Sequence, residues 1–254
     1  MPRLPLVLLA LLVASSLAGC AASRATAPLT SLPTGSPGRL SLPGPWDDSQ
    51  GSLTPGVHRV ASEDGVAWVL VPSDLSSPRP LLVFFHGEGG QAREAIDLLR
   101  PYADEQGMVL LAPQPVGETW DLRGDGRGSD AVALQQSLVG LGAMVPLDLA
   151  RVGVAGFAGG ASYALSLGLE NGDLFGSVLA FSPGFVTPRQ PRGTPRVFIA
   201  HGTSDEVLDI DACSRALVPR LRAMGYGVTY REFDGRHAVP PEVASAAARW
   251  FTGG

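Results

Sequence analysis

The stretch RVGVAGFAGGASYALSL, from Arg151 to Leu167, decides the fold. Its first five residues form a short run typical of a buried strand, and the residues after Gly160 carry apolar side chains at helical spacing. The turn between them has Gly156 and Gly160 at its ends and Ala158 at its centre. A strand that passes directly into a helix in this way indicates a layered α/β protein.

The same alternation continues along the chain on both sides of this turn. The segments expected to be strands are 66–71, 81–85, 108–112, 151–155, 177–181, 196–200 and 228–233. The segments expected to be helices are 93–105, 130–144, 160–169, 211–224 and 241–251. This order predicts an α/β fold with a mostly parallel sheet and helices on both faces. In such sheets, ligands bind beyond the carboxyl ends of the strands.

Length and composition indicate one folded domain, which we place at 56–254. The 254 residues are 45% hydrophobic and 17% charged, enough for one sizeable core. The net charge is -5 and the basic residues are scattered, so no nucleic-acid partner is expected. The histidines are far apart in sequence and no cysteine pair accompanies them, so we expect no metal and no other cofactor. We expect the domain to be a monomer.

The N-terminus has the pattern of an export signal. Arg3 precedes an apolar run, and Leu17-Ala18-Gly19-Cys20 follows it. This tetrapeptide resembles a bacterial lipobox, which implies that residues 1–19 are removed and that Cys20 carries a diacylglycerol. The alternative is an ordinary secretory signal with a chance cysteine. Residues 20–55 are rich in Ala, Ser, Thr, Pro and Gly, which predicts a flexible tether. We therefore expect an exported protein that Cys20 anchors to the cell membrane or envelope.

The turn around Ala158 has the glycine spacing of a nucleophile-bearing elbow. In the pattern G-x-S-x-G, the central residue sits in a strained turn that pushes its side chain into the cleft, and the glycines let strand and helix pass closely. Gly156 and Gly160 supply those glycines, and Ala158 occupies the central position. Because glycine-rich turns before helices also bind phosphates, this spacing needs support from the rest of the chain.

That support comes from an acidic and a basic residue in the order that a catalytic triad requires. Asp205 follows the strand expected at 196–200, and His237 follows the strand expected at 228–233. Asp205 would orient the imidazole and His237 would act as general base. Asp209 is the rival acid and His201 is the rival base, but the position of His201 at a strand end, before the turn, favours a structural role for it.

A glycine-rich turn, HGEGG at 86–90, ends another expected strand. Tight turning alone would explain its glycines. The alternative is an oxyanion hole built from the backbone N–H of Glu88 and that of Gly159. Phe157 and Trp120 are candidates to line the cleft, and a core position for Trp120 is the alternative. The connection 183–195 is too short for a helical cap, so we expect an open cleft and no large cap domain.

Six segments together resemble a known family. They are HGEGG (86–90), GETWD (117–121), GFAGGASYALSLGLENGDLF (156–175), AFSPGF (180–185), HGTSDEVL (201–208) and DGRHAVPPE (234–242). The sequence from about residue 60 onward resembles bacterial α/β-hydrolase esterases related to phospholipase/carboxylesterases and polyhydroxyalkanoate depolymerases. The resemblance implies the α/β-hydrolase fold, Asp205 and His237 as acid and base, and Glu88 and Gly159 as oxyanion donors.

The chain departs from these relatives at the nucleophile, because it reads Gly156-Phe157-Ala158 where they read G-F-S. An alanine cannot form the acyl-enzyme, so Ser162 and Ser182 are the remaining candidate nucleophiles. One hypothesis is a serine-esterase scaffold for small-molecule or polymer-end esters that lost its serine, in evolution or by deliberate substitution. The other is a binding module without turnover, which holds an ester, acid or glycan at the cell envelope.

Overall fold

The computed structural model describes residues 38–44, 51–121 and 128–253. The expected signal sequence, Cys20 and the first part of the expected tether lie outside the described residues. In the described part, the centre is a sheet of eight strands in the order β1-β2-β4-β3-β5-β6-β7-β8. The strands are β1 (Gly56–Ala61), β2 (Val66–Val71), β3 (Arg79–Phe85), β4 (Val109–Pro113), β5 (Leu147–Phe157), β6 (Ser177–Phe181), β7 (Arg196–Gly202) and β8 (Val228–Phe233).

The sheet is parallel from β4 to β8, and its antiparallel part is confined to one edge. There β1 pairs with β2 and β2 pairs with β4 in antiparallel register. The other neighbours all pair in parallel. The carboxyl ends of β3, β5, β6, β7 and β8 therefore lie at the same edge of the sheet. The candidate site residues Glu88, Ala158, Asp205 and His237 each follow one of these strands.

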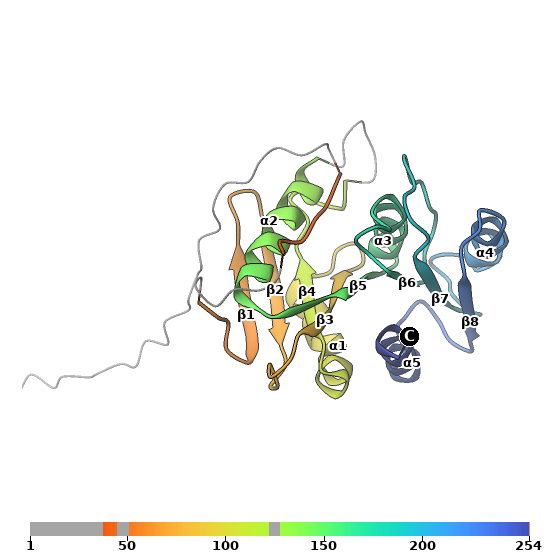
Figure 1. The fold of residues 1–254 in the computed structure, drawn as a ribbon. Helices are drawn as coiled ribbons and strands as arrows, with labels where there is room; N and C mark the ends of the chain where they lie inside the picture. The colour runs from red at the N-terminus through yellow and green to blue at the C-terminus, as the bar shows by residue number, and fades with distance from the viewer. Residues whose placement is uncertain (1–37, 45–50, 122–127, 254) are drawn as a thin grey trace, which may run out of the picture.

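Helices cover both faces of the sheet (Figure 1). They are α1 (Ala92–Gln106), α2 (Ser129–Met144), α3 (Gly159–Glu170), α4 (Ser214–Ala223) and α5 (Pro241–Thr252). Buried side chains of α1 and α5 share one apolar cluster, and those of α2, α3 and α4 share the other. The expected mostly parallel sheet with helices on both faces is confirmed. The connection from β6 to β7 contains no helix, and no large cap is present in the described part of the chain.

All seven expected strands are present, and the structure adds one more. This is β1 (Gly56–Ala61), a strand whose side chains are mostly only half-buried. An edge strand that buries so little gives a weak hydrophobic alternation, which explains why the sequence did not reveal it. The helix expected from residue 211 begins only at Ser214 as α4.

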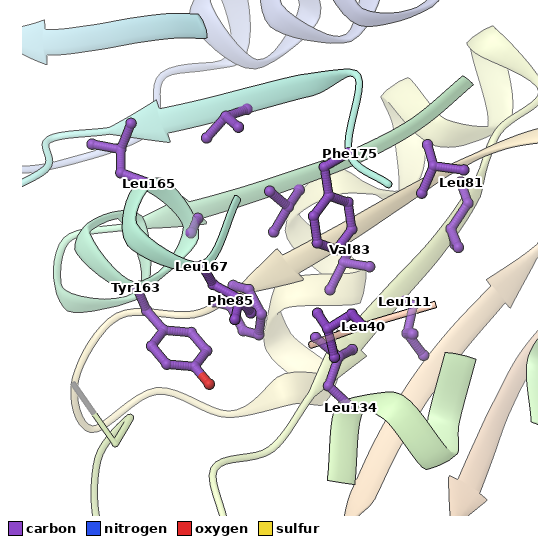
Figure 2. Close-up of a cluster of buried hydrophobic side chains, with 14 of the residues drawn as sticks. Leu40, Leu81, Val83, Phe85, Leu111, Leu134, Tyr163, Leu165, Leu167 and Phe175 are labelled. Carbon is purple, nitrogen blue, oxygen red and sulfur yellow. The ribbon is translucent and has the colours of Figure 1, made fainter. Parts of the chain in front are cut away.

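The larger core lies between the sheet and the helices α2, α3 and α4, and Figure 2 shows part of it. Phe85 of β3 meets Tyr163 of α3 edge to face, with ring centroids 4.8 Å apart and planes at 87°. Phe175 and Leu134 belong to the same cluster. Every residue of α3 from Gly160 to Glu170 is buried. The helix that begins at the elbow is therefore held on all sides, which fixes the position of its first turn.

Residues 38–44 correct the expectation that the tether extends to residue 55. Leu40 is only 4% exposed and packs into the larger core. Its backbone N–H donates to the buried Asn171 Oδ1 over 2.9 Å, and Arg39 pairs with Asp173. An apolar side chain with a docking site at the end of α3 outweighs the Pro- and Ser-rich composition around it. This part of the expected tether belongs to the folded body.

Candidate active site

The structure places Ala158 in the strained turn that the glycine spacing predicted. Its backbone has φ 53° and ψ -119°, and the residue is buried. The Ala158 N–H donates to the Phe181 carbonyl over 2.9 Å, and its carbonyl accepts the N–H groups of Ala161 and Ser162. A non-glycine residue in such a conformation costs about 1 to 3 kcal/mol. The neighbouring strand and α3 hold the turn in place despite that cost.

The glycines that flank Ala158 are required by direct contact between backbones. A Cβ on Gly156 would lie 2.2 Å from the Gly160 carbonyl oxygen, and a Cβ on Gly160 would lie 2.2 Å from the Phe85 carbonyl oxygen. At Gly159, by contrast, a Cβ would have no neighbour within 4 Å. The start of α3 therefore packs on the end of β3 without any side chain between them.

Asp205 and His237 meet in the manner expected of a triad. His237 Nδ1–H donates to Asp205 Oδ2 over 2.7 Å, and the Asp205 side chain is fully buried. The N–H groups of Val207 and Leu208 donate to its other oxygen over 3.0 and 2.8 Å. Burial disfavours the charged form, but these donors outweigh it and hold the pKa of Asp205 below its ordinary value. Asp209, the rival acid, is exposed and accepts an N–H of its own turn instead.

His201, the rival base, is a buried support for the same carboxylate. Its Nε2 lies 2.8 Å from the Leu208 carbonyl and 3.2 Å from Asp205 Oδ2, so Nε2 carries the proton and donates. Its Nδ1 then accepts the Ser214 hydroxyl proton over 2.7 Å. Burial lowers the pKa of His201 and keeps the ring neutral. With no exposed surface, His201 has no access to a substrate.

Three segments converge around Ala158. The ring of Phe157 lies 4.6 Å from that of His237, centroid to centroid. A Cβ on Gly87 would come within 3.2 Å of Phe157 and within 3.5 Å of Ala158 Cβ. The elbow thus lies between the turn after β3 and the loop that carries His237. Phe157, which we expected to line the cleft, is half-buried between them.

The turn after β3 fixes the orientation of the Glu88 N–H. The Gly87 carbonyl accepts the Gly90 N–H over 3.0 Å and the His86 Nδ1–H over 2.8 Å. Because C=O and N–H of a trans peptide point in opposite directions, these bonds direct the Glu88 N–H away from the interior of the turn. Neither this N–H nor that of Gly159 has an acceptor among the residues that the structure describes. Both remain available to an oxyanion.

Trp120 does not line the cleft, which corrects our first expectation for it. The side chain is 4% exposed and lies against Phe85 and Tyr163, with centroid distances of 4.8 and 5.4 Å. Its Nε1–H donates to the His86 carbonyl over 2.9 Å. A large apolar ring with one polar atom suits a buried site with a single acceptor. Trp120 therefore supports the turn after β3 from the core.

The remaining candidate nucleophiles, Ser162 and Ser182, are both buried. Ser162 Oγ accepts the N–H groups of Gly184 and Phe185 over 3.0 and 3.3 Å, which holds the connection after β6. Ser182 is fully buried, with φ 47°, and its N–H donates to the Ala200 carbonyl. Both hydroxyls are buried, so neither is accessible as a nucleophile in this structure.

A pocket of about 370 Å³ opens beside this group. Its lining residues are Phe84, His86, Gly87, Glu88, Gly90, Gln91, Glu94, Ala95, Leu98 and Phe157. The pocket shares Glu88 with the candidate oxyanion hole and shares Phe157 with the contact to His237. In the described part of the chain no cluster of three or more His, Cys, Asp or Glu residues has the arrangement of a metal site.

Comparison with solved structures identifies the architecture. An S-formylglutathione hydrolase from Staphylococcus aureus matches with a TM-score of 0.64 at 14% identity, over 77% of this chain and 97% of that one. The fluorophosphonate-binding serine hydrolase F of the same organism matches with a TM-score of 0.65 at 16% identity, over 78% and 99%. A carboxylesterase from Bacillus cereus matches with 0.55 at 20% identity, over 73% and 92%.

The chain has the α/β-hydrolase fold. No protein-family model matches its sequence, and no curated protein does so significantly. At these identities the α/β-hydrolase likeness concerns the fold, and the chemistry must be argued from the side chains.

Two residues that support this candidate site were not assigned that role in the sequence. His86 locks the peptide that carries the Glu88 N–H, and His201 Nε2 lies 3.2 Å from the Asp205 carboxylate. Each histidine stands directly before a glycine near the end of a parallel strand. That repeated His-Gly pair was the available signal.

The contacts of Gly159 and Gly160 predict that alanine substitution at these two positions changes the free energy of unfolding by very different amounts. Gly160→Ala should lower the free energy of unfolding by about 2 to 4 kcal/mol, because its Cβ would overlap backbone atoms that cannot move aside. Gly159→Ala, the matched control, should change it by less than about 1 kcal/mol. Urea unfolding followed by circular dichroism measures both. Equal midpoints for the two variants would contradict the close approach of α3 to β3.

The buried His201 predicts a loss of stability on mild acidification. Its pKa is lowered in the folded protein, so below its ordinary value of 6.5 the unfolded chain binds a proton that the folded chain does not. The free energy of unfolding should therefore fall as the pH drops through this window, by at most about 1.4 kcal/mol per pH unit from this residue.

His201→Gln keeps an N–H donor but removes the titration, so its unfolding free energy should fall less between pH 7.5 and 5. Urea unfolding at both pH values gives the comparison. Parallel losses in parent and variant would show that His201 does not titrate differently on unfolding.

Proposed function

We propose that the chain is a serine-esterase scaffold for carboxylic ester hydrolysis whose nucleophile position is vacant. The observation that supports this most directly is the His237–Asp205 pair, 2.7 Å apart, beside an elbow whose central residue has φ 53°. Besides a nucleophile, acyl transfer requires three features. They are a central elbow residue in a strained backbone conformation, a histidine oriented by a buried carboxylate, and two backbone N–H groups without an acceptor.

The chemistry follows from placing a hydroxyl on residue 158. His237 Nε2 would take the hydroxyl proton as the oxygen attacks the ester carbonyl, and the N–H groups of Glu88 and Gly159 would stabilise the oxyanion. Collapse of the intermediate would expel the alcohol, which recovers its proton from His237. Water would then attack the acyl-enzyme by the same route. Asp205 would hold the imidazole in the tautomer that leaves Nε2 free.

With Ala158 in place, the cleft would bind an ester and leave it largely intact. Loss of a catalytic serine costs on the order of a million-fold in turnover, whereas oxyanion and binding contacts remain. The absence of a large cap favours substrates that approach from solvent, such as short esters or exposed polymer ends.

The second candidate is a binding module that holds an ester, acid or glycan ligand at the cell envelope. Ala158 favours this binding module, because residue 158 keeps a strained backbone conformation although it carries no hydroxyl for catalysis. Both candidates share the cleft, and they differ in whether one added oxygen is sufficient for turnover.

Ala158→Ser should create a serine esterase, because the sequence encodes every other group that the proposed chemistry needs. The variant should hydrolyse a short-chain aryl ester and be labelled by a fluorophosphonate probe, and the parent protein should do both far more slowly. Steady-state assay and gel fluorescence measure the two properties.

Ala158→Gly is the matched control. It relieves the positive φ without adding a nucleophile, so it should stay inactive and melt at a higher temperature than the parent. Adding His237→Ala to Ala158→Ser should abolish the gained activity. A folded Ala158→Ser protein that neither turns over esters nor reacts with the probe would favour the binding module.

We also propose that the protein is an envelope lipoprotein attached through Cys20, a proposal supported by the lipobox-like sequence at 17–20. In the described ranges no helix is long and apolar enough to cross a membrane. The mature protein should begin at Cys20, carry a diacylglycerol and sediment with membranes. Intact-mass analysis from the native host checks this, and an unmodified N-terminus elsewhere would contradict it.

A further inference from the structure

The pocket beside Ala158 lies where one end of an ester substrate would enter. One of its walls is the turn that carries the Glu88 N–H, and another is Phe157, whose ring packs on His237. A substrate carbonyl placed between the N–H groups of Glu88 and Gly159 therefore has this 370 Å³ pocket within reach. A larger hollow of about 510 Å³ is lined by residues 75–78 and 146–150, at the opposite ends of the strands, and has no part in the site.

The position of His237 assigns the pocket to the alcohol side of the ester. In ester cleavage the histidine gives its proton to the departing oxygen, so the alcohol portion must lie close to that ring. Phe157 is the residue that touches the ring and also lines the pocket. The alcohol portion is thus the part of the substrate that extends along Phe157 into the pocket.

The charges of the pocket all have one sign. Glu88 and Glu94 are exposed residues of its lining, which contains no Arg or Lys, and the one histidine of the lining, His86, is buried and bonded to the Gly87 carbonyl. The nearest arginine in sequence, Arg93, is engaged elsewhere. Its guanidinium lies 5.1 Å from the centre of the Trp68 ring and its Nε pairs with Asp97 over 3.2 Å.

Most of the remaining surface of the pocket is apolar and partly aromatic, and Gln91 is an exposed polar residue of the lining. Phe84, Phe157, Ala95 and Leu98 contribute to it, and Leu98 is 43% exposed although it is a large apolar residue. Aromatic and aliphatic walls with carboxylates at the rim suit a compact, weakly hydrated cation such as a quaternary ammonium group. The same carboxylates disfavour an anionic alcohol.

We propose that this pocket selects esters of cationic alcohols, with the ammonium group held between Glu88, Glu94 and the apolar wall. The proposal rests on the esterase scaffold proposed above, and it names the substrate class of that site. Glu88 thereby serves the site twice, through its backbone N–H toward the oxyanion and through its side-chain charge toward the alcohol.

The experiment uses the full chain with Ala158 unchanged. Because alanine cannot form an acyl-enzyme, ester binding can be measured at equilibrium. The ligands are acetylcholine and its neutral isostere 3,3-dimethylbutyl acetate, which differ only in the charge of the alcohol portion. Binding is measured by titration with NMR detection at low ionic strength. Acetylcholine should bind about three- to tenfold more tightly, and its advantage should shrink as salt is added.

Two variants test whether Glu88 and Glu94 cause the preference for acetylcholine. Glu88→Gln combined with Glu94→Gln keeps the Glu88 backbone N–H and should abolish the advantage of acetylcholine. Glu105→Gln is the control. It removes one charge from an exposed position of α1, the helix that also carries Glu94, but outside the pocket, so this variant should still prefer acetylcholine.

Equal affinity for the two esters, no binding of acetylcholine, or a preference that survives the double Gln variant would overturn the proposal. Failure of the esterase scaffold itself has a different readout. It would show as a folded Ala158→Ser protein that does not hydrolyse a neutral aryl ester, whatever the two affinities are.

Discussion

The contact between the start of α3 and the end of β3 is the constraint on which the site depends. At Gly160 the helix backbone lies so close to the Phe85 and His86 carbonyls that no side chain fits. This contact places the first turn of α3 directly beside the turn after β3. Gly159 and Glu88, whose N–H groups are the candidate oxyanion donors, are thereby brought to the same edge of the sheet. Substitution at Gly160 would separate them before it altered any chemical group.

The second organising feature is the buried charge of Asp205. A carboxylate without exposed surface needs donors for its lone pairs, since an unpaired buried charge is strongly destabilising. Here Val207 and Leu208 donate to one oxygen, and His237 and His201 lie on the other. The requirement to satisfy this charge orders the turn after β7 and orients His237 at the same time. Stability and the geometry of the candidate base therefore have a common cause.

The sequence predicted the fold and most of the site because both depend on local signals. Strand and helix periods revealed the layered sheet, and glycine spacing revealed the elbow with Ala158 at its centre. The order of Asp205 and His237 after two strands was sufficient to pair them. The sequence did not reveal what depends on long-range packing, such as the burial of Trp120 under the turn after β3 or the docking of Leu40 on Asn171. From composition alone, a Pro- and Ser-rich segment is predicted to be a flexible tether. Only the structure shows that Leu40 of this segment packs into the core.

The groups around Ala158 are each held by contacts that do not involve a side chain at residue 158. His237 is oriented by Asp205, the Glu88 peptide is locked by His86 and Gly90, and the elbow is fixed by backbone contacts. A hydroxyl at residue 158 would therefore add one atom to the site and leave the cleft, its donors and its pocket unchanged. Recognition and turnover are separable in such an architecture. For this reason, binding of an ester by the protein with Ala158 would report on the same pocket and the same polar groups that would select a substrate in an Ala158→Ser variant.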